Sequence, residues 1–152
     1  TTLPYTVDQR QSPALQERTP TLAEMTDSAL RCLARQGQGF LLQVEGARID
    51  HACHVNDAAA LLWDQLAFDD AIAVALRFAA GRDDTLVVIT AIGWTGMAHT
   101  SDHVLLTAIG AGRARLAGLH HHTQVHHLLC DLLGIPARVR NPGQQLPAVV
   151  GV

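Results

Sequence analysis

The stretch that decides the predicted fold is Val44-Glu45-Gly46-Ala47-Arg48-Ile49-Asp50-His51-Ala52-Cys53-His54-Val55-Asn56-Asp57. It follows an apolar run, residues 39–44, which predicts a short buried strand. Glu45 would lie at the carboxyl end of this strand, where open α/β sheets place ligands and catalytic groups. Asp50 and His54 are four residues apart, so a helix that begins near Asp50 presents both side chains on one face.

Three side chains of this stretch are potential metal ligands. A carboxylate oxygen and an imidazole nitrogen from adjacent helical turns suit zinc, and an additional carboxylate suits magnesium. The same residues also have a simpler interpretation, because acids that follow a strand often cap a helix or interact with its dipole. A histidine in a first turn is more often packed or solvated than bound to metal. The spacing alone leaves both interpretations open.

Four motifs, in the same order along the chain, resemble motifs of the alkaline phosphatase family. Residues 20–26 are similar to the family's Pro-Ser/Thr-Leu-x-x-Met-Thr helix opening, and residues 44–54 are similar to its Val-Glu-Gly-x-x-Ile-Asp-x-x-x-His motif. Residues 84–91 resemble the family's next core strand, and residues 99–102 (His-Thr-Ser-Asp) resemble its late His-Thr motif. The helix expected over residues 123–134 is similar to the family's closing helix. The resemblance covers most of residues 3–135.

This resemblance implies a metal centre and an activity. Asp50, His54 and His99 would be the protein ligands of the first catalytic zinc, and they are expected within about 5 Å of a common point. Glu45 would bind magnesium. His51 stands where the family has Lys or His, and it would act in the water and phosphate network rather than as a ligand. The implied reaction is hydrolysis of phosphate monoesters through a phosphoserine intermediate, with zinc and magnesium as cofactors.

Parts of the family pattern have no counterpart here. In the family, the strand that ends in Thr-Ala continues with an Asp-His pair that binds a second zinc, whereas Ala91 is followed by Ile92. We therefore predict that Ala91 and Ile92 are not covalently continuous in the native protein, or that an inserted loop is disordered there. The nucleophilic serine, the phosphate-binding arginine and an aspartate shared between metals are also missing. The resemblance thus implies a C-terminal fragment that has no catalytic nucleophile and, alone, no activity.

The expected fold class is α/β: a partial three-layer α/β/α sandwich with a mostly parallel sheet, similar to that of alkaline phosphatases. Strand, long helical connection and strand imply a parallel pair with a right-handed crossover. A capping box of Thr21 and Glu24 predicts the start of the first long helix, and Thr123 is expected to cap the last one. The expected strands are residues 39–44, 84–91 and 104–109; the helical connection is residues 56–80, with a candidate break at 68–70.

Three segments are expected along the chain. Residues 1–20 contain three of the six prolines and are expected to be an extended segment that leads into the domain. Residues 21–135 would form the C-terminal part of an alkaline-phosphatase-like domain. Residues 136–152 carry prolines without apolar periodicity and are expected to be a flexible tail.

Composition excludes several classes of protein. Hydrophobic residues make up 48% of the chain, which argues against disorder, yet the sequence has no apolar run long enough to span a bilayer. The net charge is −3 and the sequence has no basic stripe, so nucleic-acid binding is not expected. The three cysteines match neither a disulfide framework nor a zinc ribbon.

Other potential metal ligands have simpler explanations. Cys53 precedes His54 directly, but the family has no thiolate at this position, and an oxygen-rich phosphatase site needs none. A histidine tract near the last helix is expected to be a solvent-facing loop that can bind nickel or zinc adventitiously. Its members are His120, His121 and His122, with His126 and His127 nearby.

Two further functions stay open. A relative in the wider phosphatase and sulfatase superfamily would share these ligands, with a Ser or Thr nucleophile in a phosphatase and a formylglycine in a sulfatase. A metal-binding or oligomerising fragment without activity would take up zinc without turnover. The resemblance also implies a periplasmic or secreted location, although the chain shows no signal peptide, and a homodimer for the intact protein.

Overall fold

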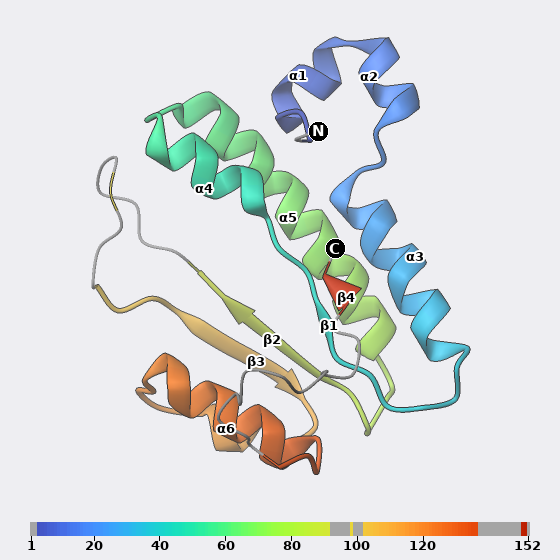
Figure 1. The fold of residues 1–152 in the computed structure, drawn as a ribbon, viewed down its shortest axis with the longest axis vertical. Coiled ribbons are helices and arrows are strands. Elements are labelled where there is room, and N and C mark those ends of the chain that lie inside the picture. Colours follow the sequence, from blue (N-terminus) through green and yellow to red (C-terminus); the bar gives the residue numbers. More distant parts are fainter. Residues whose placement is uncertain (1–2, 92–97, 99–101, 137–149, 152) are drawn as a thin grey trace, which may run out of the picture.

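The computed structural model describes residues 3–91, 98, 102–136 and 150–151. More than half of the described residues are in helices (Figure 1). The elements are, in order, α1 (Thr6–Gln11), α2 (Pro13–Arg18), α3 (Leu22–Ala34), β1 (Leu42–Gln43), α4 (Ala47–His54), α5 (Ala58–Ala79), β2 (Leu86–Thr90), β3 (Leu106–Gly110), the 3₁₀ helix η1 (Arg113–Leu116), α6 (His122–Leu132) and β4 (Val150–Gly151).

The predicted sandwich with a mostly parallel sheet is wrong for this structure. β2 pairs with β3 in the antiparallel sense, with Leu86 opposite Gly110 and Thr90 opposite Leu106. β1 has two residues and pairs in parallel with β4 instead of β2. The long helix α5 therefore does not connect two neighbouring strands of one sheet. An antiparallel pair forms from segments close in sequence and needs no crossover helix, which is why β2 and β3 pair directly.

The structure has helices where an extended segment was predicted, because α1 and α2 occupy most of residues 3–20. Pro13 stands at the start of α2, where a helix needs no amide hydrogen from that residue. The chain nevertheless bends between these helices and α3. Gln9 Nε2 donates to the Thr19 carbonyl at 2.5 Å, and this hydrogen bond joins α1 to the C-terminal end of α2.

α3 begins as predicted. The Thr21 hydroxyl accepts from the Glu24 amide at 3.2 Å, and the Glu24 carboxylate accepts from the Thr21 amide at 2.8 Å, so the capping box is confirmed. The apolar face of α3 packs on α5 and buries Leu30. Thr26 is also buried there, and its hydroxyl donates to the Leu22 carbonyl at 2.7 Å.

α5 is one continuous helix, without the candidate break at residues 68–70. The Asp57 side chain caps it by accepting from the Ala60 amide at 3.0 Å. Asp69 and Asp70 are exposed, so two successive acids cost the helix no desolvation. α5 is the centre of the helical layer, because α1, α3 and α4 all pack against it and β2 lies on its other side (Figure 1).

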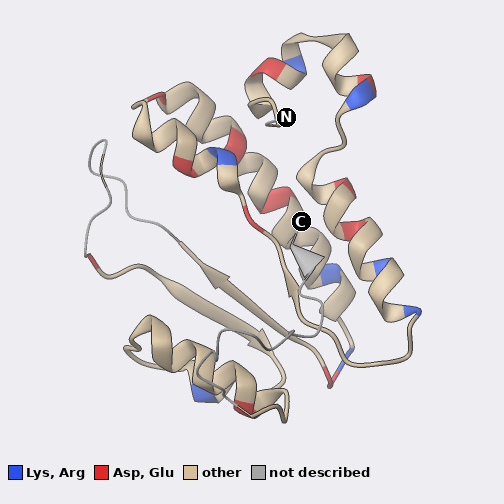
Figure 2. Cartoon of the chain, in the orientation of Figure 1, with Lys and Arg blue, Asp and Glu red and all other residues tan. Residues whose placement is uncertain are grey.

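The sheet and the last helix form the other side of the molecule. α6 lies beyond β3, on the side away from α5 (Figure 1), and contacts η1. Its N-cap is His121 rather than the predicted Thr123: the His121 ring accepts from the Thr123 amide, while the Gln124 side chain accepts from the His121 amide at 2.7 Å. The β2–β3 ribbon carries no charged residue, whereas charges of both signs are spread over the helices (Figure 2).

Several large apolar side chains in this region face solvent. Leu105 is 74% exposed and Leu119 is 76% exposed, and Val104, Ile109 and Ile135 are also exposed. In the described part of the chain, no helix has the length and hydropathy that a membrane span requires. The expected tail falls almost entirely outside the described residues.

Candidate metal and phosphate site

The turn from β1 into α4 fixes the position of the predicted site. Gly46 is the N-cap of α4, and a Cβ at this position would lie 2.8 Å from Ile49 Cδ1 and 3.2 Å from the Phe68 ring. A larger residue would have to displace a packed ring of α5. Glycine therefore lets the chain pass closely over α5, and Glu45 is placed beside the first turn of α4.

Asp50 and His54 share one face of α4, in agreement with their spacing. His54 Nε2 lies 3.5 Å from Asp50 Oδ2, and each side chain is 39% exposed. A carboxylate and an imidazole in this arrangement can both turn toward one ion, and their exposure leaves an ion access to them. Their role as zinc ligands stays a prediction.

Glu45, just before α4, and His51 on α4 line a cavity whose lining does not include Asp50 or His54. The cavity has a volume of about 170 Å³ and is bounded by the N-terminal segment, the start of α3, α4 and α5. Arg48 and Asp64 also reach this cavity, and its other walls are mainly apolar. The structure thus places Asp50 beside His54 on α4, and it places Glu45 and His51 at the cavity.

His99 lies outside the described residues, so the predicted convergence of Asp50, His54 and His99 stays a prediction. The predicted break between Ala91 and Ile92 also lies there, because Ile92 is not described. Within residues 3–91, 98, 102–136 and 150–151, no three or more His, Cys, Asp or Glu side chains are grouped so that they could hold a metal ion. Asp50 and His54 fit two positions of a zinc site, and a third ligand would have to come from elsewhere.

Cys53 does not fit a metal thiolate. Its side chain is buried on the inner face of α4. Burial raises the pKa of the Cys53 thiol, and the nearby Asp50 charge raises it further. A thiol must lose its proton to bind a metal ion, so both effects disfavour this role.

A buried carboxylate on α5 was not predicted as part of the site. Asp64 is only 8% exposed, and it accepts hydrogen bonds from the Thr6 hydroxyl at 2.7 Å and the Thr6 amide at 3.3 Å. Burial raises the pKa of Asp64, and the hydrogen bonds from Thr6 partly oppose this shift. The sequence signal was an acid at helical spacing from Ala60 and Ala71, which are both buried.

Arg48 was also missed as a functional residue, although it lies in the decisive stretch. Its guanidinium carbon lies 3.6 Å from the centre of the Tyr5 ring. Its Nη1 lies 3.3 Å from His51 Nδ1. Arg48 Nε is buried without a hydrogen-bond partner in the described structure. These contacts join the N-terminal segment to the first turns of α4.

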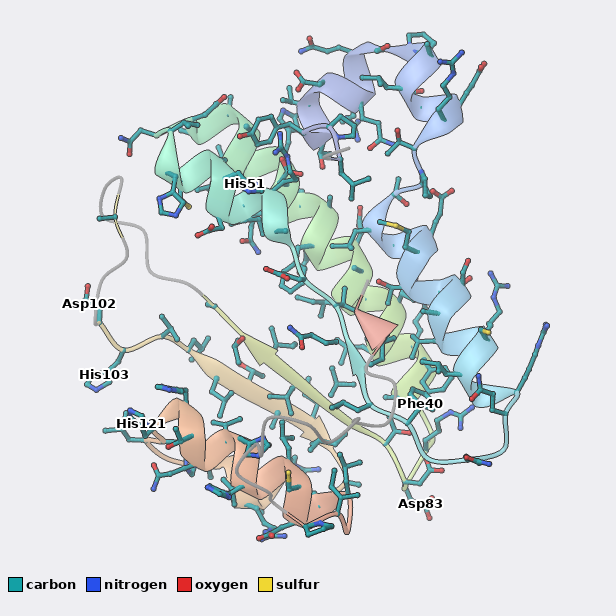
Figure 3. All side chains as sticks on the ribbon, viewed as in Figure 1. Phe40, His51, Asp83, Asp102, His103 and His121 are labelled. Atoms are coloured by element: carbon teal, nitrogen blue, oxygen red, sulfur yellow. The ribbon has the colours of Figure 1, made fainter. Side chains whose placement is uncertain are left out.

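The histidine tract lies far from this site. Figure 3 shows His51 on α4 and His121 beside α6, on opposite sides of the β2–β3 ribbon. The His121 and His122 rings are 4.1 Å apart, and His126 Nε2 lies 3.7 Å from Cys130 Sγ. These side chains are occupied with helix capping and contacts within their own segment.

Comparison with known proteins identifies the family of the chain. The sequence profile of the family described as alkaline phosphatase matches residues 3–92. The chain is a member of the alkaline phosphatase family, as its motifs predicted.

Individual relatives extend this similarity. The chain is 40% identical over 80 residues to an alkaline phosphatase of Escherichia coli K12, covering 53% of this chain and 17% of that protein. It is 43% identical over 108 residues to a streptomycin-6-phosphate phosphatase of Streptomyces griseus, covering 66% and 22%. It is 51% identical over 72 residues to a membrane-bound alkaline phosphatase of Bombyx mori, covering 47% and 13%. The matches therefore span less than a quarter of each of these relatives. No solved structure matches the chain significantly.

Proposed function

We propose that this chain supplies the first zinc site and the magnesium ligand of a phosphatase that hydrolyses phosphate monoesters through a phosphoserine intermediate. Family membership supports a phosphatase function. The observation that carries the metal assignment is the pairing of Asp50 and His54 at 3.5 Å on one face of α4, inside the stretch matched by the family profile. His99 would be the third protein ligand, and Glu45 would bind magnesium.

In the proposed reaction, the metal ion and the residues of this chain would have different roles. Zinc held there would supply positive charge against the negative charge of a departing oxygen and would lower the pKa of a water that it binds. Asp50 and His54 would hold it from successive turns of α4, whose inner face is anchored by the buried Ala52 and Cys53. A ring N–H of His51 would donate a hydrogen bond to water or to a phosphate oxygen at the cavity. The nucleophilic serine and the arginine that binds phosphate would come from outside these 152 residues.

The exposed apolar side chains around β3 and α6 support a role as part of a larger domain. Exposed patches of this kind usually mark contacts with other protein surface. The sheet region would then pack against the rest of the phosphatase. A homodimer and a periplasmic or secreted location also belong to this proposal, on the strength of the family alone.

The test is zinc binding by the purified chain, followed by competition with a chromophoric chelator. Asp50→Asn combined with His54→Ala should weaken the tightest binding at least about 10-fold, because it removes both α4 ligands. The matched control is His121→Gln with His122→Gln, which removes two histidines from the distant tract and should leave that binding unchanged. If zinc binding instead disappears with the tract and persists without Asp50 and His54, the metal assignment is wrong.

The pairing of Asp50 and His54 also supports a second function, zinc binding without catalysis. The Asp50 and His54 pair would also suit an inactive zinc-binding fragment, because neither residue requires a nucleophile in the same chain. Phosphate provides the discrimination. A phosphatase site should bind inorganic phosphate more tightly when zinc is present, whereas a purely structural zinc site should show no such coupling.

A further inference from the structure

Three contacts hold the N-terminal segment against the helices that carry the candidate site. The Tyr5 ring stacks on the Arg48 guanidinium at 3.6 Å, and the Thr6 hydroxyl donates to Asp64 at 2.7 Å. One helical turn later, the Arg10 guanidinium lies 4.5 Å from the Trp63 ring centre. The first contact ends on α4 and the other two end on α5, so residues 5–10 bridge both helices.

Arg48 is the member of this set that reaches the candidate site. A guanidinium has five N–H donors and no acceptor. A hydrogen bond between Arg48 Nη1 and His51 Nδ1, which are 3.3 Å apart, therefore requires Nδ1 to be the acceptor. A neutral imidazole that accepts at Nδ1 carries its proton on Nε2.

We propose that Arg48 is a positioning residue that fixes the ring orientation and the tautomer of His51, and that Tyr5 holds Arg48 in place for this purpose. His51 then presents Nε2–H as a donor to an acceptor at the cavity. The planar guanidinium suits both tasks, because its face stacks on an aromatic ring while its edge donates in a fixed direction. His51 is exposed, so without Arg48 its imidazole would rotate and exchange between tautomers. The use of this donor on water or phosphate rests on the proposed function.

The stacking also places a constraint on Arg48 itself. Its Nε is buried and has no partner in the described structure, which is a cost for a charged group. The opposite charge of Asp64 and the contact with the Tyr5 ring offset this cost. Loss of Tyr5 should therefore release Arg48 toward solvent and with it the hydrogen bond to His51.

The test is the tautomer of His51, observed by long-range ¹H–¹⁵N correlation on the full chain labelled in histidine, at a pH where imidazole is neutral. In the unaltered chain the pattern should show Nε2–H alone. Arg48→Met removes every donor at similar length and should give a mixture of both tautomers. Arg48→Lys retains a cationic donor and should restore part of the preference. Tyr5→Leu should shift the pattern toward the mixture, whereas Tyr5→Phe keeps the ring and should leave it unchanged.

Thiol labelling shows whether the variants keep α4 folded. Cys32 is exposed, whereas Cys53 on α4 and Cys130 on α6 are buried. In a correctly folded variant, only Cys32 should react quickly. If Arg48→Met exposes Cys53, that variant no longer reports on His51 alone. The tautomer pattern of Tyr5→Leu then tests the proposal, because this substitution changes no residue of α4.

An identical tautomer pattern in the unaltered chain, Arg48→Met and Tyr5→Leu overturns the proposal. An Nδ1–H pattern in the unaltered chain also overturns it, because that nitrogen would then be unable to accept. The measurement needs neither metal nor substrate. Its failure leaves the proposed zinc site standing, and a failure of zinc binding leaves the role of Arg48 standing.

Discussion

Helices α4 and α6 each place a histidine four residues from another potential ligand, but the two pairs differ in chemistry and support. On α4, His54 Nε2 lies 3.5 Å from an Asp50 carboxylate oxygen. On α6, His126 Nε2 lies 3.7 Å from the sulfur of Cys130, which is buried. The carboxylate is already a hard ligand, whereas a thiol must first lose its proton. Spacing alone therefore does not identify a metal site; the partner and its exposure do.

The packing around the two helices differs as well. α4 contacts α5, against which α3 and α1 also pack, so the helix that carries Asp50 and His54 rests on the helical core. α6 contacts η1, and several large apolar side chains near it are exposed. A ligand pair needs a rigid base to keep its geometry. The comparison predicts that perturbations in the α4 region have larger effects than equivalent ones near α6.

The largest effect is expected in the helical core. Leu30→Ala should lower the free energy of unfolding by about 2–5 kcal/mol, because it leaves a cavity where α3 packs on α5. Leu30 is 7% exposed. Leu133 follows α6 and is 43% exposed, so Leu133→Ala should cost less than about 0.5 kcal/mol. Urea denaturation followed by circular dichroism measures both, and similar losses would show that the two regions are packed alike.

The next effect is stabilisation by zinc. At a free zinc concentration 100 times the dissociation constant, binding to the folded chain should add about 2.7 kcal/mol to the free energy of unfolding. This gain should vanish in Asp50→Asn with His54→Ala and should persist in His121→Gln with His122→Gln. Thermal unfolding with and without zinc measures the difference. Equal gains in both variants would remove the distinction between α4 and α6.

Helix capping gives a smaller contrast. Asp57→Ala removes the acceptor for the Ala60 amide at the start of α5 and should cost about 1 kcal/mol. His121→Ala removes the cap of α6, but that ring nitrogen lies 3.4 Å from the Thr123 amide, near the limit of a hydrogen bond. We expect a loss of only a few tenths of a kcal/mol there, by urea denaturation. A loss at His121 as large as that at Asp57 would contradict this ranking.

Helices α3, α4, α5 and α6 could be predicted from the sequence because their signals are local, whereas α1 and α2 lie where an extended segment was predicted. Thr21 and Glu24 are three residues apart and form the predicted capping box, and the spacing of Asp50 and His54 placed them on one face. The pairing of strands is not local. The apolar run before Glu45 suggested a strand beside β2, yet β1 contains only Leu42–Gln43 and pairs with β4.

The site was predicted only where its residues are close in sequence. Glu45, His51 and the Asp50–His54 pair all lie within one motif, and the family resemblance supplied their roles. Thr6 and Asp64 are 58 residues apart, and nothing in either local sequence indicates the other. Tyr5 and Arg48 are also distant in sequence, so the contact that supports His51 emerges only from the fold.

Asp64 predicts a modest dependence of stability on pH. Burial raises the pKa of Asp64 above its ordinary 3.8, so the folded state holds this proton more tightly than the unfolded state. As pH rises from about 3.8 through the raised pKa, the unfolded state loses its proton first, and the free energy of unfolding falls. Asp64→Asn, which has no proton to lose, should not show this component of the fall. Urea denaturation across that interval measures it, and parallel pH profiles for the two chains would contradict the assignment.

The smallest effect is expected on the rate of phosphomonoester hydrolysis. In this chain alone, removal of the α4 ligands should not change that rate. An activated nucleophile and an electrostatic clamp on the phosphoryl group provide most of the rate in such reactions, and no motif for either occurs in these residues. The purified chain should therefore hydrolyse a model phosphomonoester no faster than a buffer blank with the same zinc. Asp50→Asn with His54→Ala should give the same rate as the unaltered chain. Turnover above the blank that disappears in this variant would mean that the chain contains a complete catalytic site, and α4 would then differ from α6 in catalysis as well as in metal binding.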